Sequence, residues 1–222
     1  MLRQIFSGSF NFYDVVAYLV AVLLIIFLIL PFHEWAHAFV AYLLGDKEAK
    51  SRGRLTLNPI SHIDIVGALA MIFVGFGWAK PVPINPNNFK KPKWGMALSA
   101  LAGPLSNLLL AYIFMIIYKV AYYLDAKYIT FILVQAMLIN LGLAVFNLLP
   151  VPPLDGSRLL TVFLPTKAYF KIMEHENIIM VILIVLSITG ILDVPLYYLE
   201  NFAINVMDSL SGWVDLIMIA VK

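Results

Sequence analysis

Long apolar stretches, separated by short polar or proline-rich ones, make up most of this chain. Residues 15–32 carry no charge, and Glu34 is the only charged residue between Asp14 and Asp46. Because about 20 apolar residues cross a bilayer, this stretch is long enough for a spanning helix. The pattern predicts apolar segments at residues 13–44, 63–76, 95–124, 128–149 and 177–192, and an amphipathic segment at 196–221. We therefore expect an all-α polytopic membrane protein with five to six transmembrane helices.

The shortest apolar segment is residues 63–76. A helix of about 14 residues measures roughly 21 Å, less than the roughly 30 Å of a bilayer core. Basic clusters at residues 47–54 and 80–93 flank this segment. Both clusters are cytoplasmic only if the segment enters and leaves on the same side. We therefore expect a short re-entrant or β-hairpin-like segment here. The proline-rich stretch PVPINPNNFKKP that follows cannot be a regular helix and is expected to be extended or a hairpin.

Composition agrees with this assignment. Of the 222 residues, 62% are hydrophobic and 13% charged, which is far from the composition of a soluble protein. The net charge of +2 gives no reason to expect nucleic acid as a partner. No cysteine is present, so thiolate metal sites and disulfides are excluded. We expect one membrane-embedded domain over residues 1–222, with a core at about 13–165 and C-terminal helices at 177–221.

The sequence HEWAH places His33, Glu34 and His37 inside the first apolar segment. Positions i and i+4 share one face of a helix, so both imidazoles can bind one metal ion with the glutamate alongside. Such a site leaves a coordination position for water, whose proton the glutamate can take. Ionisable groups in a spanning helix are costly, and a metal would satisfy all three. The alternatives are a buried hydrogen-bonded cluster that serves packing, or a proton relay.

A catalytic zinc commonly takes a third protein ligand. His33 precedes Leu44 by eleven residues, which is about 16 Å of helix, so the third ligand should also lie just inside the cytoplasmic face. Asp155 in NLLPVPPLDG meets this condition, because the prolines break the fourth apolar segment near its cytoplasmic end. The alternative is that Asp155 only caps a short helix at residues 156–163.

Three motifs, HEWAH, AGPLSN and NLLPVPPLDG, together resemble the site-2 protease family of intramembrane zinc metalloproteases (peptidase family M50). The resemblance covers at least residues 32–158. It implies that His33, His37 and Asp155 bind one Zn²⁺ and that Glu34 is the catalytic base. It also implies substrate-binding roles for Asn107, which with Gly103 matches a G-x-x-x-N pattern, and for Asn147. The chain resembles a minimal member, without the PDZ or CBS domains of many relatives.

Other polar residues in the apolar segments allow more than one interpretation. Asn107 and Asn147 could anchor an extended peptide, or they could make ordinary hydrogen bonds between helices. His62 and Asp64 are expected to be a polar pair at the interface; the alternatives are that they line the entry of water or orient a metal ligand. Polar residues recur on one side of the C-terminal segment, and we expect this stripe to face the bundle or water and to gate substrate entry. The stripe comprises Asn201, Asn205, Asp208, Gly212 and Asp215.

These observations predict a zinc metalloendopeptidase that cuts membrane-protein substrates within or near their transmembrane segments. The expected partners are a transmembrane protein substrate and the lipid bilayer. The expected location is the cell membrane, with the active site nearer the cytoplasmic face. Two other functions stay open: a metal or proton transporter that uses the same histidine, glutamate and aspartate cluster, and a relative that binds membrane proteins without cutting them.

Overall fold

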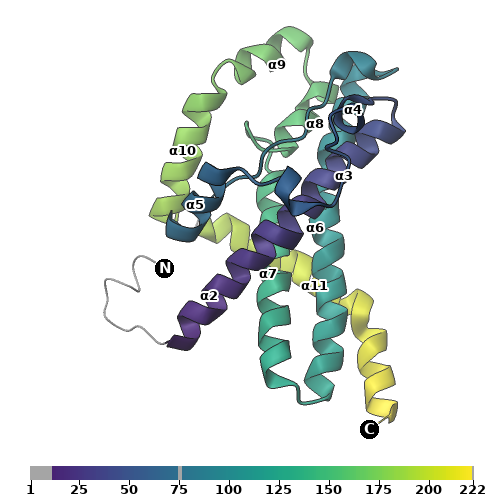
Figure 1. Ribbon diagram of the computed structural model, residues 1–222, viewed down its shortest axis with the longest axis vertical. Helices are drawn as coiled ribbons and strands as arrows, with labels where there is room; N and C mark the ends of the chain where they lie inside the picture. The colour runs from purple at the N-terminus through teal and green to yellow at the C-terminus, as the bar shows by residue number, and fades with distance from the viewer. Residues whose placement is uncertain (1–11, 75–76, 222) are drawn as a thin grey trace.

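The computed structural model describes residues 12–74 and 77–221, and these residues form helices joined by turns and extended segments (Figure 1). No β-strand occurs among them. The prediction of an all-α polytopic membrane protein is confirmed. The elements in chain order are α2 (Phe12–Leu24), η1 (Ile25–Ile29), α3 (Leu30–Leu43), α4 (Glu48–Ser51), η2 (Pro59–Ser61), α5 (Ile65–Val74), η3 (Pro86–Asn88), α6 (Pro92–Tyr123), α7 (Lys127–Leu148), α8 (Gly156–Phe163), α9 (Thr166–Met173), α10 (Glu176–Thr189) and α11 (Asp193–Val221).

Four helices in the described residues are long and apolar enough to cross a bilayer: Leu19–Leu43, α6, α7 and α11. A fifth span is possible if α9 and α10, which meet at a bend of 59°, count as one. The predicted minimum of five spans is thus reached only if α9 and α10 form one span, and a sixth span is not found among the described residues. The reason lies in the predicted segment 177–192, because α10 has only 14 residues and is too short to cross alone.

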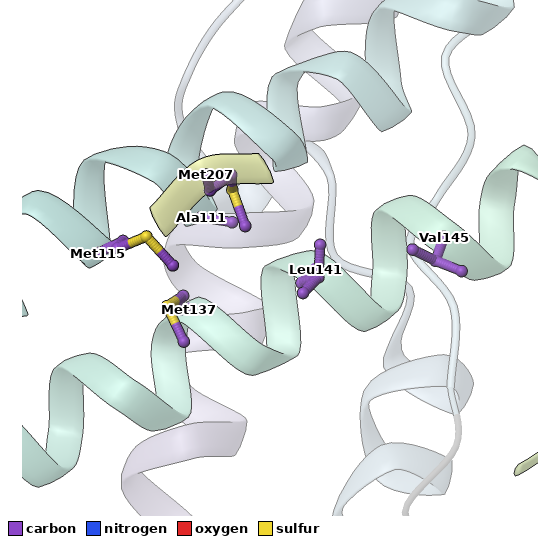
Figure 2. Close-up of a cluster of buried hydrophobic side chains, with 6 residues drawn as sticks. All are labelled: Ala111, Met115, Met137, Leu141, Val145 and Met207. Atoms are coloured by element: carbon purple, nitrogen blue, oxygen red, sulfur yellow. The ribbon is translucent and has the colours of Figure 1, made fainter. Parts of the chain in front are cut away.

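Helices α6 and α7 form an antiparallel hairpin at the centre of the molecule, and α11 crosses it (Figure 1). Their shared core is small and rich in methionine, as Figure 2 shows. Its buried members are Ala111 and Met115 of α6, Met137, Leu141 and Val145 of α7, and Met207 of α11. Without water to drive association inside a bilayer, close packing of such side chains holds the helices together. Helix α3 packs on the N-terminal half of α6 and carries the HEWAH motif there.

The short segment at α5 returns to the side from which it left. The Lys80 amide donates to the His62 carbonyl at 2.8 Å, so the chain before α5 lies beside the chain after it. A methyl group on Gly67 would overlap the backbone of Trp78, which shows how closely the returning chain passes α5. Arg54 also donates to the Lys80 carbonyl at 2.6 Å and joins the two basic clusters. The chain thus turns back on itself around α5, as the re-entrant prediction requires; its entry into the membrane stays a prediction, and Gly75 and Phe76 lie outside the described residues.

A π-helical turn, η1, precedes α3, the helix that carries the HEWAH motif. Pro31 lacks an N–H and cannot make the usual helical hydrogen bond. The chain meets this constraint with η1, where the Leu30 N–H bonds to the Ile25 carbonyl five residues earlier. Helix α3 then begins next to a buried Pro31 and continues without interruption through the motif to Leu43. The proline therefore sets the start of α3 rather than breaking it.

The polar stripe of α11 faces the bundle through its two aspartates. Lys119 of α6 is buried, and its Nζ lies 2.8 Å from Asp208 Oδ1 and 2.6 Å from Asp215 Oδ2. Two carboxylates seven residues apart sit two turns apart on one face of a helix, so a single lysine can bind both. The stripe was predicted to face the bundle or water: it contacts the bundle at these two aspartates, while Asn205 and much of Asp208 are exposed. Its predicted role as a gate stays a prediction.

Candidate metal centre

His33 and His37 point into the protein from one face of α3. Both side chains are buried, and their Nε2 atoms lie 3.0 Å apart. Their spacing of four residues places one imidazole a turn above the other. An apolar spanning helix therefore presents two nitrogen ligands to a single point in the interior.

Asp155 reaches the same point from a distant part of the chain. Its Oδ2 lies 3.1 Å from His33 Nε2 and 3.2 Å from His37 Nε2. Helix α7 ends at Leu148, and the three prolines that follow keep the chain out of helical conformation until Gly156. Gly156 passes so close to the carbonyls of Leu148 and Leu149 that a methyl group would overlap them. This tight return turns the aspartate inward.

The structure does not support the alternative that Asp155 only caps α8. Asp155 does stand at the N-cap position of α8, but its side chain makes no capping hydrogen bond. The carboxylate faces the two histidines instead, and only 17% of the side chain is exposed. The N-cap position thus accounts for the backbone of Asp155 but not for its side chain.

Helix α6 forms the back wall of the site. The Ser99 carbonyl accepts a hydrogen bond from His37 Nδ1 at 2.7 Å. A carbonyl oxygen can only accept, so Nδ1 carries the proton and Nε2 presents its lone pair to the site. One turn further along, Gly103 lies against both imidazoles, and a methyl group there would overlap His37 Nε2 and Cε1. The glycine therefore lets α6 approach the histidines closely enough to orient one of them.

Glu34 lies next to these atoms without joining the cluster as closely as Asp155. One of its oxygens lies within 4.8 Å of a ligand nitrogen of each histidine. Its Oε2 accepts a hydrogen bond from the Val82 amide at 3.0 Å, and the side chain is half-buried. Glu34 is thus close enough to exchange a proton with a group bound at the histidines.

The geometry fits a divalent metal ion. The two Nε2 atoms and Asp155 Oδ2 form a nearly equilateral triangle with sides of 3.0, 3.1 and 3.2 Å. A tetrahedral ion with bonds of about 2.0 Å places its ligand atoms about 3.3 Å apart, which is close to these values. Three atoms that offer lone pairs at such short range repel one another unless a cation or proton lies between them. Two histidines and a carboxylate are a ligand set that zinc accepts, and a tetrahedral ion would keep its fourth position free.

The predicted substrate-binding asparagines lie apart from this triangle. Asn107, one turn beyond Gly103 on α6, is fully buried, and neither amide atom has a partner among the described residues. Asn147 is half-buried and donates to the Leu143 carbonyl of its own helix at 2.9 Å. The structure brings neither asparagine into hydrogen-bond contact with the histidines or with Asp155. Their substrate-binding roles stay predictions.

The second polar pair forms local contacts. His62 is buried and its Nε2 hydrogen-bonds the Thr56 carbonyl at 2.8 Å, while Asp64 accepts from the Gly67 amide at 2.8 Å at the start of α5. These bonds hold the segment around α5 in place and do not reach the candidate metal ligands. The contacts that sequence reasoning missed near the site come from the backbone of Ser99 and Val82, and backbone groups carry no residue-type signal.

Comparison with known proteins identifies the family of this chain. The model of a family described as Peptidase family M50 matches residues 117–190, a stretch that includes Asp155. The chain is 44% identical over 176 residues to the Bacillus subtilis (strain 168) protein named “Putative zinc metalloprotease YwhC”, in an alignment that covers 75% of this chain and 80% of that protein. The chain belongs to peptidase family M50, the site-2 protease family.

More distant relatives of this M50 chain carry the same kind of name. “Putative zinc metalloprotease Rip2” of Mycobacterium tuberculosis strain H37Rv is 27% identical over 172 residues, which cover 72% of this chain and 64% of the relative. “Putative zinc metalloprotease MJ0611” of Methanocaldococcus jannaschii is 43% identical over 61 residues, 28% of this chain and 31% of the relative. No solved structure matches the chain significantly. Family membership and the histidine–glutamate group support a metalloprotease, and the apolar helices make it an integral membrane protein.

Proposed function

We propose that this protein is a zinc-dependent endopeptidase that hydrolyses peptide bonds within or near the transmembrane segments of other membrane proteins. The observation that carries the proposal is the triangle of His33 Nε2, His37 Nε2 and Asp155 Oδ2, with Glu34 beside it. These groups come from two segments more than a hundred residues apart and meet in the interior of an apolar bundle. Placing ionisable groups in the membrane interior costs free energy, and where such groups occur they usually serve a function.

Each of the four side chains has a role in this proposal. His33, His37 and Asp155 hold the zinc ion, and the Ser99 carbonyl fixes the tautomer of His37. A bound zinc would supply a water molecule of lowered pKa and polarise the peptide carbonyl. Glu34 takes the proton of the attacking water and passes it to the leaving amine.

The position of the site inside the membrane determines what conformation a substrate must adopt there. His33 lies ten residues before the end of α3 at Leu43, which corresponds to about 15 Å of helix. A helical substrate has all its backbone groups hydrogen-bonded, so it must unwind locally before its carbonyl can react. Asn107, whose amide atoms lack partners among the described residues, is proposed to bind the unwound backbone together with Asn147.

We place the site nearer the cytoplasmic face of the cell membrane. Support comes from the basic clusters at residues 47–54 and 80–93, which the Arg54 to Lys80 hydrogen bond brings to the same end of the bundle as the C-terminus of α3. Lipid and a transmembrane protein substrate are the partners of this proposal.

A transporter would use the same residues differently. Ionisable groups of a transporter are expected across the whole membrane depth. Among the described residues, a second intramembrane cluster is centred on Lys119, sixteen residues beyond Gly103 on α6, which is about 24 Å along the helix. Its lysine is already paired with Asp208 and Asp215. No charged residue lies on α6 between Gly103 and Lys119, so the two clusters do not form a continuous polar path across the membrane. This gap and the pairing of the lysine favour the protease.

The Glu34→Gln variant separates the candidate functions. A purified protease should bind one zinc per chain in both forms, cut single-span substrate peptides in the native form and lose cleavage in the variant. Chelation should abolish cleavage, and added zinc should restore it. A transporter should keep part of its metal flux in the variant, and a binding protein should be indifferent. The matched control is Glu174→Gln, at an exposed glutamate in the turn between α9 and α10. Unchanged cleavage by Glu34→Gln would refute the proposal.

A further inference from the structure

The extended segment after α5 presents one backbone amide to Glu34. In the sequence PVP, Pro81 and Pro83 have no N–H, so Val82 carries the only amide proton of these three residues. That proton is donated to Glu34 Oε2, with 3.0 Å between nitrogen and oxygen. The two prolines fix their own φ angles, and Pro83 also restricts Val82 to extended conformations. The donor is thereby held in one direction.

The Val82 side chain fixes the same residue from the other side. It is buried with Ala38 of α3 and Ala49 of α4, and Leu55 packs against this cluster. Because Ala38 lies one turn beyond Glu34 on the same helix, the side chain and the amide of Val82 both contact α3. Val82 therefore cannot move relative to Glu34 without breaking contacts of both kinds.

A buried carboxylate clamps the chain just after Val82. Asp46 is 1% exposed, and its Oδ2 accepts from the Asn85 amide at 2.7 Å. Its Oδ1 accepts from the Asn88 side-chain amide at 2.6 Å and from the Glu48 amide at 3.0 Å. A buried carboxylate with three donors is well satisfied and costly to disturb. Asp46 follows the end of α3 by three residues, so the helix that carries Glu34 also anchors the clamp.

We propose that the Val82 amide is a positioning group for the Glu34 carboxylate, and that Asp46 holds the Val82 segment in place for this purpose. The proposal rests on the proposed protease function. With Oε2 bound to the amide, the carboxylate cannot rotate freely, and Oε1 stays available to accept the proton of the attacking water. The role is one of orientation: neither Val82 nor Asp46 contacts a metal ligand or is required to touch the substrate.

The test removes the amide proton of Val82 and keeps three apolar side-chain carbons at this buried position. Val82→Pro removes the N–H at a position already restricted to extended backbone. Loss of a hydrogen bond to a charged group should lower kcat by about 10- to 100-fold. KM and zinc content should stay within about twofold, because neither substrate binding nor the ligands change. The matched control is Ile84→Pro, two residues further along, whose amide donates no hydrogen bond among the described residues. It should keep native kcat.

The outcomes are distinct. A native kcat for Val82→Pro, or an equal fall in kcat for Ile84→Pro, would overturn the proposal. If Val82→Pro does not fold, Asp46→Asn tests the proposal instead. In this variant a side-chain NH2 group replaces one carboxylate oxygen and so faces one of the three donors that Asp46 binds. Asp46→Asn should lower kcat in the same direction without raising KM or releasing zinc, and an unchanged kcat would again overturn the proposal. If the native protein with zinc cuts no substrate, the protease function itself fails; if it cuts and Val82→Pro cuts equally well, only the positioning role fails.

Discussion

The close approach of Gly103 to the two histidines gives a sharp prediction for Gly103→Ala. An added Cβ would lie 2.6 Å from His33 Cε1 and would overlap His37 Nε2 and Cε1 as well. Carbon atoms in ordinary contact are about 3.5 Å apart, so the two imidazoles or the whole of α6 must shift by at least about 0.9 Å. Metal sites tolerate deviations of about 0.2 Å. The addition of a single methyl group therefore requires a shift several times larger than this tolerance.

We expect Gly103→Ala to lower both zinc affinity and cleavage. Misplacement of reacting groups by about 1 Å can cost about 100-fold in rate, and we expect kcat/KM to fall by about that factor. Alanine is a better helix former than glycine by up to about 1 kcal/mol, so weaker helix formation would not explain the loss. Zinc content per chain after equilibration with a competing chelator, together with kcat/KM on a single-span peptide, measures both effects.

Gly142→Ala is the matched control. Gly142 lies within α7, and the nearest atom to an added Cβ would be Glu200 Oε1 at 3.4 Å, an ordinary contact distance. This variant gains the same helix propensity without a clash, so zinc content and kcat/KM should equal the native values. If Gly103→Ala also kept native zinc content and native kcat/KM, the close packing of α6 on the histidines would be wrong.

Three further variants test the ligand set, the polar contact of α11 and the core. Asp155→Asn should weaken zinc binding by more than about 100-fold, because even residues that only support ligands cost 10- to 100-fold; competition with a chromophoric chelator measures this, and native affinity would exclude Asp155 as a ligand. Lys119→Met leaves Asp208 and Asp215 facing each other without a cation and should destabilise the protein by about 1–2 kcal/mol, a lowering of Tm by about 3–6 °C in detergent with zinc retained. An unchanged Tm would mean that the two contacts contribute nothing. Leu141→Ala in the fully buried core should cost about 1–3 kcal/mol, since lipid replaces water as the reference and only packing is lost; a rise in Tm would contradict this.

Much of the fold follows from hydropathy alone. The long spans α6 and α7 coincide closely with the apolar segments at residues 95–124 and 128–149. The return of the chain at α5 follows from its short length and from the basic residues on both sides. The bend between α9 and α10 does not follow, because a run of apolar residues indicates that a helix is buried or in lipid but not whether it joins its neighbour in one span.

The site could be predicted where side chains carry the signal. His33, Glu34 and His37 share a helix with the right spacing, and Asp155 could be chosen by its depth and by the prolines that precede it. The contact of Lys119 with the stripe on α11 could not be foreseen, because the sequence gives the stripe but not its partner.

The supporting contacts depend on the backbone. His37 is oriented by the Ser99 carbonyl, Glu34 is bound by the Val82 amide, and Gly103 matters because of what lies next to it. Every residue other than proline has the same N–H and C=O groups, so only the packing of α3, α6 and the proline-rich segment decides which of them reach the site.

The zinc-edge X-ray absorption spectrum of the purified protein shows directly which atoms bind the metal. We expect one zinc per chain with two imidazole nitrogens and one or more oxygens at about 2.0–2.2 Å. We also expect Asp155→Asn to change the oxygen shell, and replacement of His33 or His37 by alanine to remove nitrogen scattering. A cleaving protein without stoichiometric zinc, or a zinc spectrum that none of these three substitutions alters, would rule out a catalytic zinc site made of these residues.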